Sequence, residues 1–142
     1  MRDEHVTRNR LIIEWLGAIA CACALAFVQW VLNKDSVEQP ESRTLIKYIL
    51  IDLACFSVAL LVVSRFISER LVRCSAMALL GAVSAALFID VPFFYKDIPN
   101  WRGDTVGWLM HAASFVLLNG VIALLVMFLV YGAGIVIRAN TD

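Results

Sequence analysis

Long apolar stretches separated by short polar breaks constrain this chain more than any other feature. They predict helices at about residues 10–33, 43–67, 71–90 and 104–137. Each reaches or approaches the roughly 20 residues that a helix needs to cross a ~30 Å hydrocarbon layer. Buried helices of a soluble protein are the alternative, but almost no polar residues remain to cover an outer surface. We therefore expect an all-α integral membrane protein, with residues 1–142 forming one transmembrane domain of four transmembrane helices in an antiparallel up-down bundle.

The composition points to lipid as the main surroundings of the chain. Of the 142 residues, 61% are hydrophobic and 17% are charged. Soluble domains are nearer to about half apolar and about a quarter charged. The formal net charge is zero, so no basic field exists to attract nucleic acid. We expect the lipid bilayer as a partner and no nucleic-acid partner.

The basic residues predict the orientation. The positive-inside rule assigns the side with more Lys and Arg to the cytoplasm. In the four-helix topology one side carries seven basic residues and the other five; the seven are Arg2, Arg8, Arg10, Arg65, Arg70, Arg73 and Arg138. Both termini are therefore expected in the cytoplasm. Since the chain has no N-x-S/T acceptor, we expect a multi-pass protein of a bacterial inner (plasma) membrane rather than of a secretory pathway.

The first apolar stretch resembles a signal peptide in its basic start and its Ala-x-Ala patterns. Glu14 interrupts the apolar run, however, and the pattern continues unbroken to Leu32. We therefore expect this segment to be retained as the first transmembrane helix.

Small residues predict how the helices pack. They form small-xxx-small ladders in the first and third helices, which let helix backbones approach closely where lipid supplies no hydrophobic drive. The ladders are Ala18, Ala22, Ala26 and Ala78, Ala82, Ala86. We expect the first and third helices to be the most closely packed, although alanine is also simply common in such helices. The second and fourth helices carry more large apolar residues, which suit lipid contact. The fourth stretch is too long for one crossing, so either it tilts or its ends lie outside the hydrocarbon core, and Gly132 with Gly134 marks a weak point.

Polar residues inside apolar spans are the candidates for function, because charge in hydrocarbon is costly. Asp52 lies about eight residues into the second helix and His111 about six into the fourth, entering from the same side. They could meet as a carboxylate–imidazole pair able to relay protons. The structural alternative for Asp52 is a hydrogen bond to Tyr48, one turn earlier.

Glu14 and Asn119 are further candidates. Glu14 can form an interfacial ion pair with Arg10, at i,i+4 spacing, or with Arg65 or Arg73 of the hairpin. Asn119 lies near the middle of the fourth helix, where its amide can bond across helices. Gln29 is expected to reach the polar interface at the outer end of the first helix.

Signatures of soluble enzymes are missing. There is no glycine-rich phosphate loop, no zinc-ligand spacing and no Gly-x-Ser-x-Gly motif. The four cysteines lie in or beside apolar runs, where they act as small hydrophobes. A single intramembrane histidine cannot supply both axial ligands of a b-type haem. We therefore expect no enzyme, no cofactor and no metal site.

Three functions fit these features. The first is a small non-enzymatic protein that contacts another membrane protein through its helices, as an accessory subunit or an immunity- or exclusion-type inhibitor. The second is a small proton- or cation-coupled transporter that uses Asp52 or Glu14 and forms a homo-oligomer. The third is a holin-like pore former that assembles through the alanine ladders.

Overall fold

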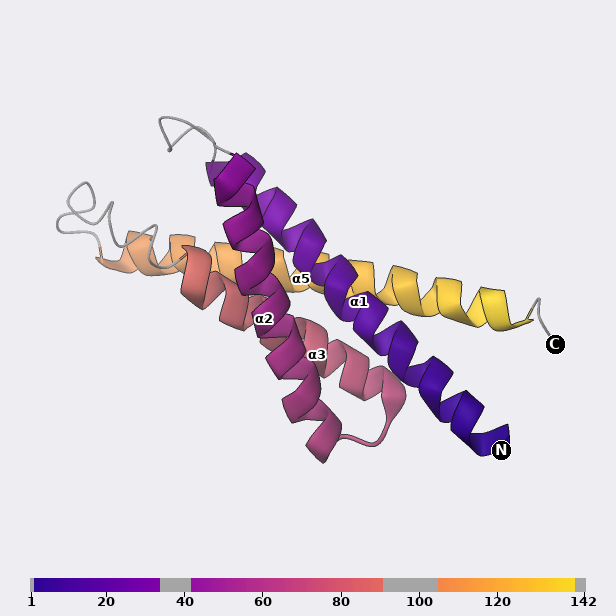
Figure 1. Ribbon diagram of the computed structural model, residues 1–142. Helices are drawn as coiled ribbons and strands as arrows, with labels where there is room; N and C mark the ends of the chain where they lie inside the picture. Colours follow the sequence, from indigo (N-terminus) through magenta and orange to yellow (C-terminus); the bar gives the residue numbers. More distant parts are fainter. Residues whose placement is uncertain (1, 34–41, 91–104, 140–142) are drawn as a thin grey trace.

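The computed structural model describes residues 2–33, 42–90 and 105–139 (Figure 1). These residues are helical except for a short turn, and none of them forms a strand. The helices are α1 (Arg2–Asn33), α2 (Ser42–Phe66), α3 (Arg70–Ala85), the π-helical turn η1 (Ala86–Asp90) and α5 (Thr105–Ala139). Four segments are long and apolar enough to cross a membrane, which suggests a multi-pass membrane protein: Ile12–Leu32, Thr44–Phe66, Arg70–Ile89 and Thr105–Ile135.

The first helix differs most from the expected bounds. α1 begins at Arg2 rather than near residue 10. The apolar pattern could not indicate this start, because only the part from Ile12 onward has the composition of a membrane span.

The last helix is continuous. α5 runs for 35 residues, or about 52 Å at 1.5 Å per residue, and it crosses α1 obliquely (Figure 1). The helix therefore has no break at Gly132 and Gly134, where a weak point is expected. Ile13 of α1 packs against Gly134, within 3.1 Å of the position that a Cβ atom would take there. The missing side chain thus serves a close helix contact.

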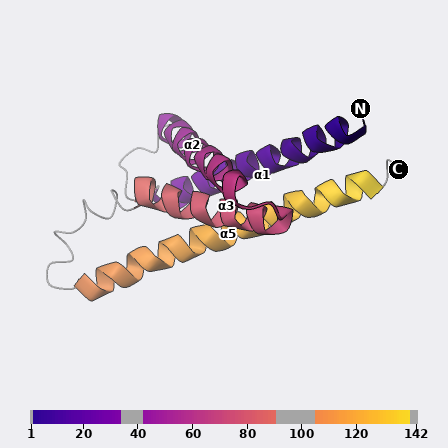
Figure 2. The same cartoon turned by 90° about the horizontal axis from the view of Figure 1, so that it is seen from below.

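The expectation that the first and third helices pack most closely is also wrong. α1 and α3 each pack mainly against α2 and α5, and they touch each other much less. In Figure 2 they lie between α2 on one side and α5 on the other. α5 is the most exposed, with 22% of its span window buried, against 44% in α3.

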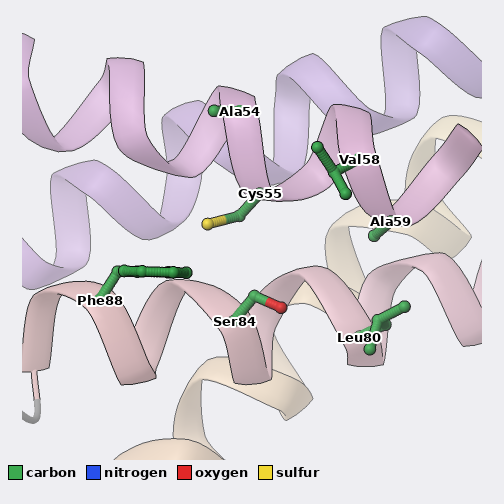
Figure 3. Close-up of a pocket in the computed structure, with 7 residues that line it drawn as sticks. All are labelled: Ala54, Cys55, Val58, Ala59, Leu80, Ser84 and Phe88. Carbon is green, nitrogen blue, oxygen red and sulfur yellow. The ribbon is translucent and has the colours of Figure 1, made fainter. Parts of the chain in front are cut away.

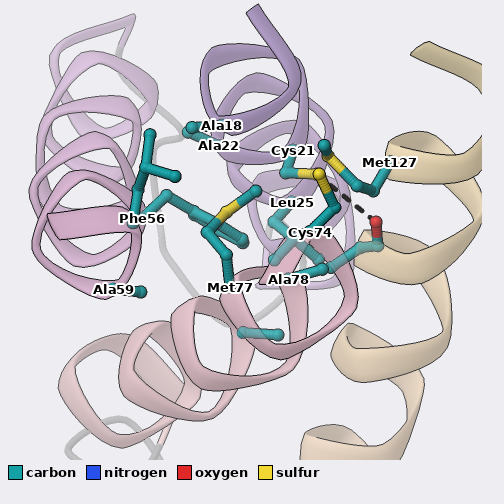
Figure 4. Close-up of a cluster of buried hydrophobic side chains, with 13 residues drawn as sticks. Ala18, Cys21, Ala22, Leu25, Phe56, Ala59, Cys74, Met77, Ala78 and Met127 are labelled. Carbon is teal, nitrogen blue, oxygen red and sulfur yellow. Dashed lines mark hydrogen bonds between the residues drawn. The ribbon is translucent and has the colours of Figure 1, made fainter. Parts of the chain in front are cut away.

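Small residues explain this arrangement. A Cβ atom added at Gly81 of α3 would collide with the ring of Phe56 from α2, and one added at Gly17 of α1 would collide with the thioether of Met127 from α5. The small residues of α1 and α3 thus provide space for large side chains of α2 and α5, rather than for each other. Figure 4 shows Phe56, Met77 and Met127 within this apolar core.

Contacts between α1 and α5 define their relative register. Ile13, Gly17 and Cys21 of α1 meet Gly134, Met127 and Ala123 of α5, respectively. The Cys21 thiol donates a hydrogen bond to the carbonyl oxygen of Ala123, with 3.3 Å between sulfur and oxygen (Figure 4). Residue numbers rise along α1 as they fall along α5, so the two helices run in opposite directions. This register shows how far along the bundle each of the remaining polar residues lies.

Candidate functional site

A buried ion cluster lies at one end of the apolar spans. Glu14 of α1 is 1% exposed. Its Oε1 accepts a hydrogen bond from Nη2 of Arg73 at 2.5 Å, and Nε of Arg70 lies 3.8 Å from the same oxygen. Of the partners expected for Glu14, Arg73 is the one found. The side chain of Arg10 lies outside the described part of the chain.

The same cluster ties three helices and a turn together. Nη1 of Arg73 donates to the carbonyl oxygens of Ile67 and Ser68, at 3.2 and 3.5 Å, in the turn between α2 and α3. The guanidinium carbon of Arg70 lies 4.9 Å from the centre of the Tyr131 ring on α5, a cation–π contact. Because α1 supplies the carboxylate, α3 both arginines and α5 the ring, the cluster fixes how these helices meet at this end.

A second group of buried polar residues lies in the other half of the bundle. Asp52 and Asn119 are fully buried, and Gln29 is 1% exposed. The expectation that Gln29 reaches the polar interface is therefore wrong. Its side chain points inward because α1 turns the same face to the core as Ala18, Cys21 and Leu25, residues that recur at helical spacing.

The contacts between helices indicate the depth of this group. Phe56 of α2 meets Gly81 of α3, so Asp52, one turn earlier on α2, lies near the level of Ala85, one turn later on α3. In the register of α1 and α5, Asn119 comes level with Leu25, one turn before Gln29. Asp52, Gln29 and Asn119 therefore share the half of the bundle that lies away from the ion cluster.

The structure does not form the predicted pair of Asp52 and His111. Asp52 is inside the bundle, whereas His111 is exposed on α5 and its ring makes an edge contact with Phe115, with 5.1 Å between the ring centres. Ala123 of α5 lies opposite Cys21 of α1. Counting the same number of residues along both antiparallel helices brings His111 of α5 level with Asn33, the last residue of α1. His111 thus lies at the end of the spans, because α5 extends beyond the other helices there.

The alanine ladders all face the interior. Each of the six ladder residues is fully buried: Ala18, Ala22, Ala26, Ala78, Ala82 and Ala86. Cys21 is also buried, and Cys23 is exposed on the other face of α1. In the part of the chain that the structure describes, no three His, Cys, Asp or Glu side chains gather in a way that could hold a metal ion.

Sequence reasoning missed a groove on the outer side of α2 and α3. It has a volume of about 440 Å³ and is lined by Ala54, Cys55, Val58, Ala59, Leu80, Ser84 and Phe88 (Figure 3). The sequence signal for it is the pairing of two helical faces, one with small residues on α2 and one with Leu80, Ser84 and Phe88 at i,i+4 spacing.

The hydroxyl of Ser84 distinguishes this groove from an ordinary lipid-facing surface. Three other serines bond back to their own helices: Ser64 Oγ donates to the carbonyl of Leu61 at 2.9 Å, Ser75 Oγ to that of Leu71 at 3.0 Å, and Ser114 Oγ to that of Met110 at 2.8 Å. Ser84 makes no such bond to any residue that the structure describes. Its hydroxyl therefore retains an unused donor and acceptor beside the groove.

These features of the chain fall into three groups. The ion cluster makes internal contacts, the second polar group is sealed inside the bundle, and the groove is open on the outside.

Comparison with protein-family models, with curated proteins and with solved structures found no match.

Proposed function

We propose that this chain is a multi-pass protein of a bacterial inner (plasma) membrane, with four helices in an up-down bundle and both termini in the cytoplasm. The four apolar helices support the crossing, and the excess of arginine near the ion cluster supports a cytoplasmic location for that end. The cluster lies where the described spans begin or end, near Ile12, Phe66, Arg70 and Ile135. Charged residues are least costly at that depth.

Within this frame we propose a non-enzymatic role: the chain binds a transmembrane helix of another membrane protein in the groove between α2 and α3. As an accessory subunit or an inhibitor, it would act by occupying that helix. The observation that carries the proposal is the open groove, with small residues on one wall and an unbonded hydroxyl on the other. Small residues allow a partner backbone to approach closely, and a hydroxyl can bond across helices.

A helix fits this groove better than an acyl chain does. Lipid tails offer no hydrogen-bonding group, so among them the Ser84 hydroxyl could bond only within the chain, as the hydroxyls of Ser75 and Ser114 do. A partner helix with a backbone carbonyl or a Ser, Thr or Asn side chain can satisfy it. Phe88 is 68% exposed and Val58 is 59% exposed, and both would gain van der Waals contacts against such a helix.

Photo-cross-linking in native membranes tests this proposal. A photoreactive side chain at Val58, in the groove, is expected to give one discrete adduct whose mass identifies a second membrane protein. The same group at Leu125 of α5, also an exposed apolar position, serves as the control and is expected to give no such adduct. An adduct of this chain with itself alone, or none at Val58, would contradict the proposal.

A matched pair of substitutions sharpens the test. Ala54 and Ala113 are both exposed alanines within spans, but only Ala54 lines the groove. Ala54→Trp is expected to fill the groove and abolish the Val58 adduct, whereas Ala113→Trp adds the same bulk elsewhere and leaves it. Equal yields from both variants would place the partner elsewhere on the chain.

A proton- or cation-coupled transporter is the second candidate, and the full burial of Asp52 within a span favours it. Glu14 suits this role less, since Arg73 already holds its carboxylate. The carrier would need to form a homo-oligomer to make a path. Transport that survives Asp52→Asn unchanged in reconstituted vesicles would dispose of this mechanism.

A further inference from the structure

Arg70 is an arginine with fewer partners than its chemistry demands. Its Nε atom is buried and has no hydrogen-bond acceptor among the described residues. The nearest carboxylate oxygen, Oε1 of Glu14, lies 3.8 Å away and already accepts a hydrogen bond from Arg73. The contact of Arg70 with the ring of Tyr131 is a cation–π contact and supplies no carboxylate or carbonyl acceptor for its five N–H donors.

The surroundings of Arg70 favour an anion. Among the charged residues near the cluster whose side chains the structure describes, Arg65, Arg70 and Arg73 are positive and Glu14 and Glu69 are negative, so positive charge is in excess by one. Arg70 is also the first residue of α3, and the N-cap residue Glu69 makes no side-chain cap hydrogen bond. The amide groups in the first turn of a helix have no intrahelical acceptors, and they too favour a negative group.

The depth of Arg70 selects the kind of anion. Its side chain is 21% exposed, so the guanidinium is partly open to the surroundings rather than sealed. Arg70 begins one apolar span, and Phe66 ends the preceding one. In a bilayer this is the level of the lipid headgroups, where phosphate groups lie against the ends of transmembrane helices.

We propose that Arg70, with the first turn of α3, binds the phosphate group of an anionic phospholipid. Guanidinium and phosphate match in a forked, two-bond geometry. Tyr131 contacts the guanidinium through its ring, and the Arg70 Nε–H, which has no acceptor among the described residues, is a donor that the phosphate can use. This inference rests on the membrane location of the chain and is independent of the partner proposed for the groove.

Competition between lipids tests the proposal on the full-length chain. The protein is extracted in mild detergent with equal amounts of phosphatidylglycerol and phosphatidylcholine, and the bound lipid is counted by native mass spectrometry. The wild-type chain is expected to retain phosphatidylglycerol preferentially. Arg70→Gln is expected to lower that retention by about tenfold, the scale of losing one charge-assisted contact. No preference in the wild-type chain would overturn the proposal without any variant being made.

The control is a basic residue at the other end of the bundle. Lys47→Gln removes the same charge from an exposed position near the start of α2 and is expected to leave the lipid preference unchanged. Equal losses for Lys47→Gln and Arg70→Gln would show that only net charge matters and would overturn the site. Arg70→Lys keeps the charge but loses the fork, so we expect retention between the wild type and Arg70→Gln.

A further arm separates lipid from free phosphate. Inorganic phosphate in large excess is expected not to displace phosphatidylglycerol, because only the lipid also gains from its acyl chains beside the helices. Displacement by inorganic phosphate would assign the site to a soluble anion and overturn the lipid. Circular dichroism checks that Arg70→Gln keeps its helices; if it does not, Arg70→Lys and the wild-type competition decide.

Discussion

The two halves of the bundle bury polar groups in different ways. At one end, a carboxylate and two arginines, Glu14 with Arg70 and Arg73, meet at the edge of the apolar spans. In the other half, Asp52, Gln29 and Asn119 are sealed between helices, and Asp52 and Asn119 lie further from the span ends than Glu14 does. The first group consists of full charges, one negative and two positive, so Glu14 compensates only one of the two arginines. The second contains two uncharged amides and a single carboxyl group.

This difference follows from the cost of charge in hydrocarbon. An ion at the centre of a bilayer is much more costly than one near the headgroups, where snorkelling and water reduce the penalty. The chain places its charged cluster where the penalty is small, whereas the deepest of these polar residues, Asp52 and Asn119, carry a single carboxyl group and an uncharged amide. Charges at the edge therefore hold the helix ends together, and Asp52 is the deep residue whose ionisation would be costly.

The largest predicted effect comes from breaking the ion cluster. Glu14→Gln removes the carboxylate and leaves Arg73 and Arg70 facing each other without it. Losing one partner of a buried ion pair destabilises a protein by about 3 kcal/mol or more. We expect a loss at the low end, near about 3 kcal/mol, because the two arginine side chains keep 21% and 19% of their surface exposed. Thermal unfolding in detergent, followed by circular dichroism, measures the change.

A double variant serves as the control for this prediction. Glu14→Gln with Arg73→Gln removes both charges, and two amides can still form a hydrogen bond. We expect it to recover part of the lost stability. A double variant less stable than Glu14→Gln would mean that the bonds from Arg73 to Ile67 and Ser68, rather than the pairing with Glu14, hold this end together.

The next largest effect comes from the packing between the two halves. Gly81→Ala places a methyl group against the ring of Phe56, which cannot move away as a flexible chain end can. Overpacking of this kind costs about 1–3 kcal/mol. Gly132→Ala is the matched control, since nothing lies within 4 Å of its Cβ position, and we expect it to be neutral or slightly stabilising. Equal unfolding temperatures for both variants would contradict this packing.

The sequence predicted the four apolar helices because that signal depends only on local composition. It failed on which helices touch, since small residues permit close approach without naming the partner. Phe56 and Met127 occupy the spaces at Gly81 and Gly17, so the alanine-rich helices lie across the core from each other. Such a choice depends on all four helices at once and cannot be derived from one helix at a time.

The candidate site was predictable from the sequence only in part. The pair of Glu14 and Arg73 followed from the membrane edge, where the hairpin returns to the first helix. The depth of His111 did not, because counting from the start of an apolar run assumes that all spans begin at one level. α5 extends past α1, which leaves His111 exposed at its end. The groove with Ser84 was missed because it needs the register of α2 against α3.

The smallest predicted effect concerns Asp52 and sharpens the comparison between the two halves. Asp52→Asn keeps the shape and one oxygen of the carboxyl group, and a hydrogen bond between helices is worth about 1 kcal/mol or less in membranes. Arg70 and Arg73, the arginines that lose their carboxylate in Glu14→Gln, lie at the other end of the bundle. We therefore expect Asp52→Asn to shift the unfolding temperature much less than Glu14→Gln does. A shift as large as that of Glu14→Gln would show that Asp52 balances a cation in the interior. In that event both halves would hold ion pairs, and the transporter would become the better account of the chain.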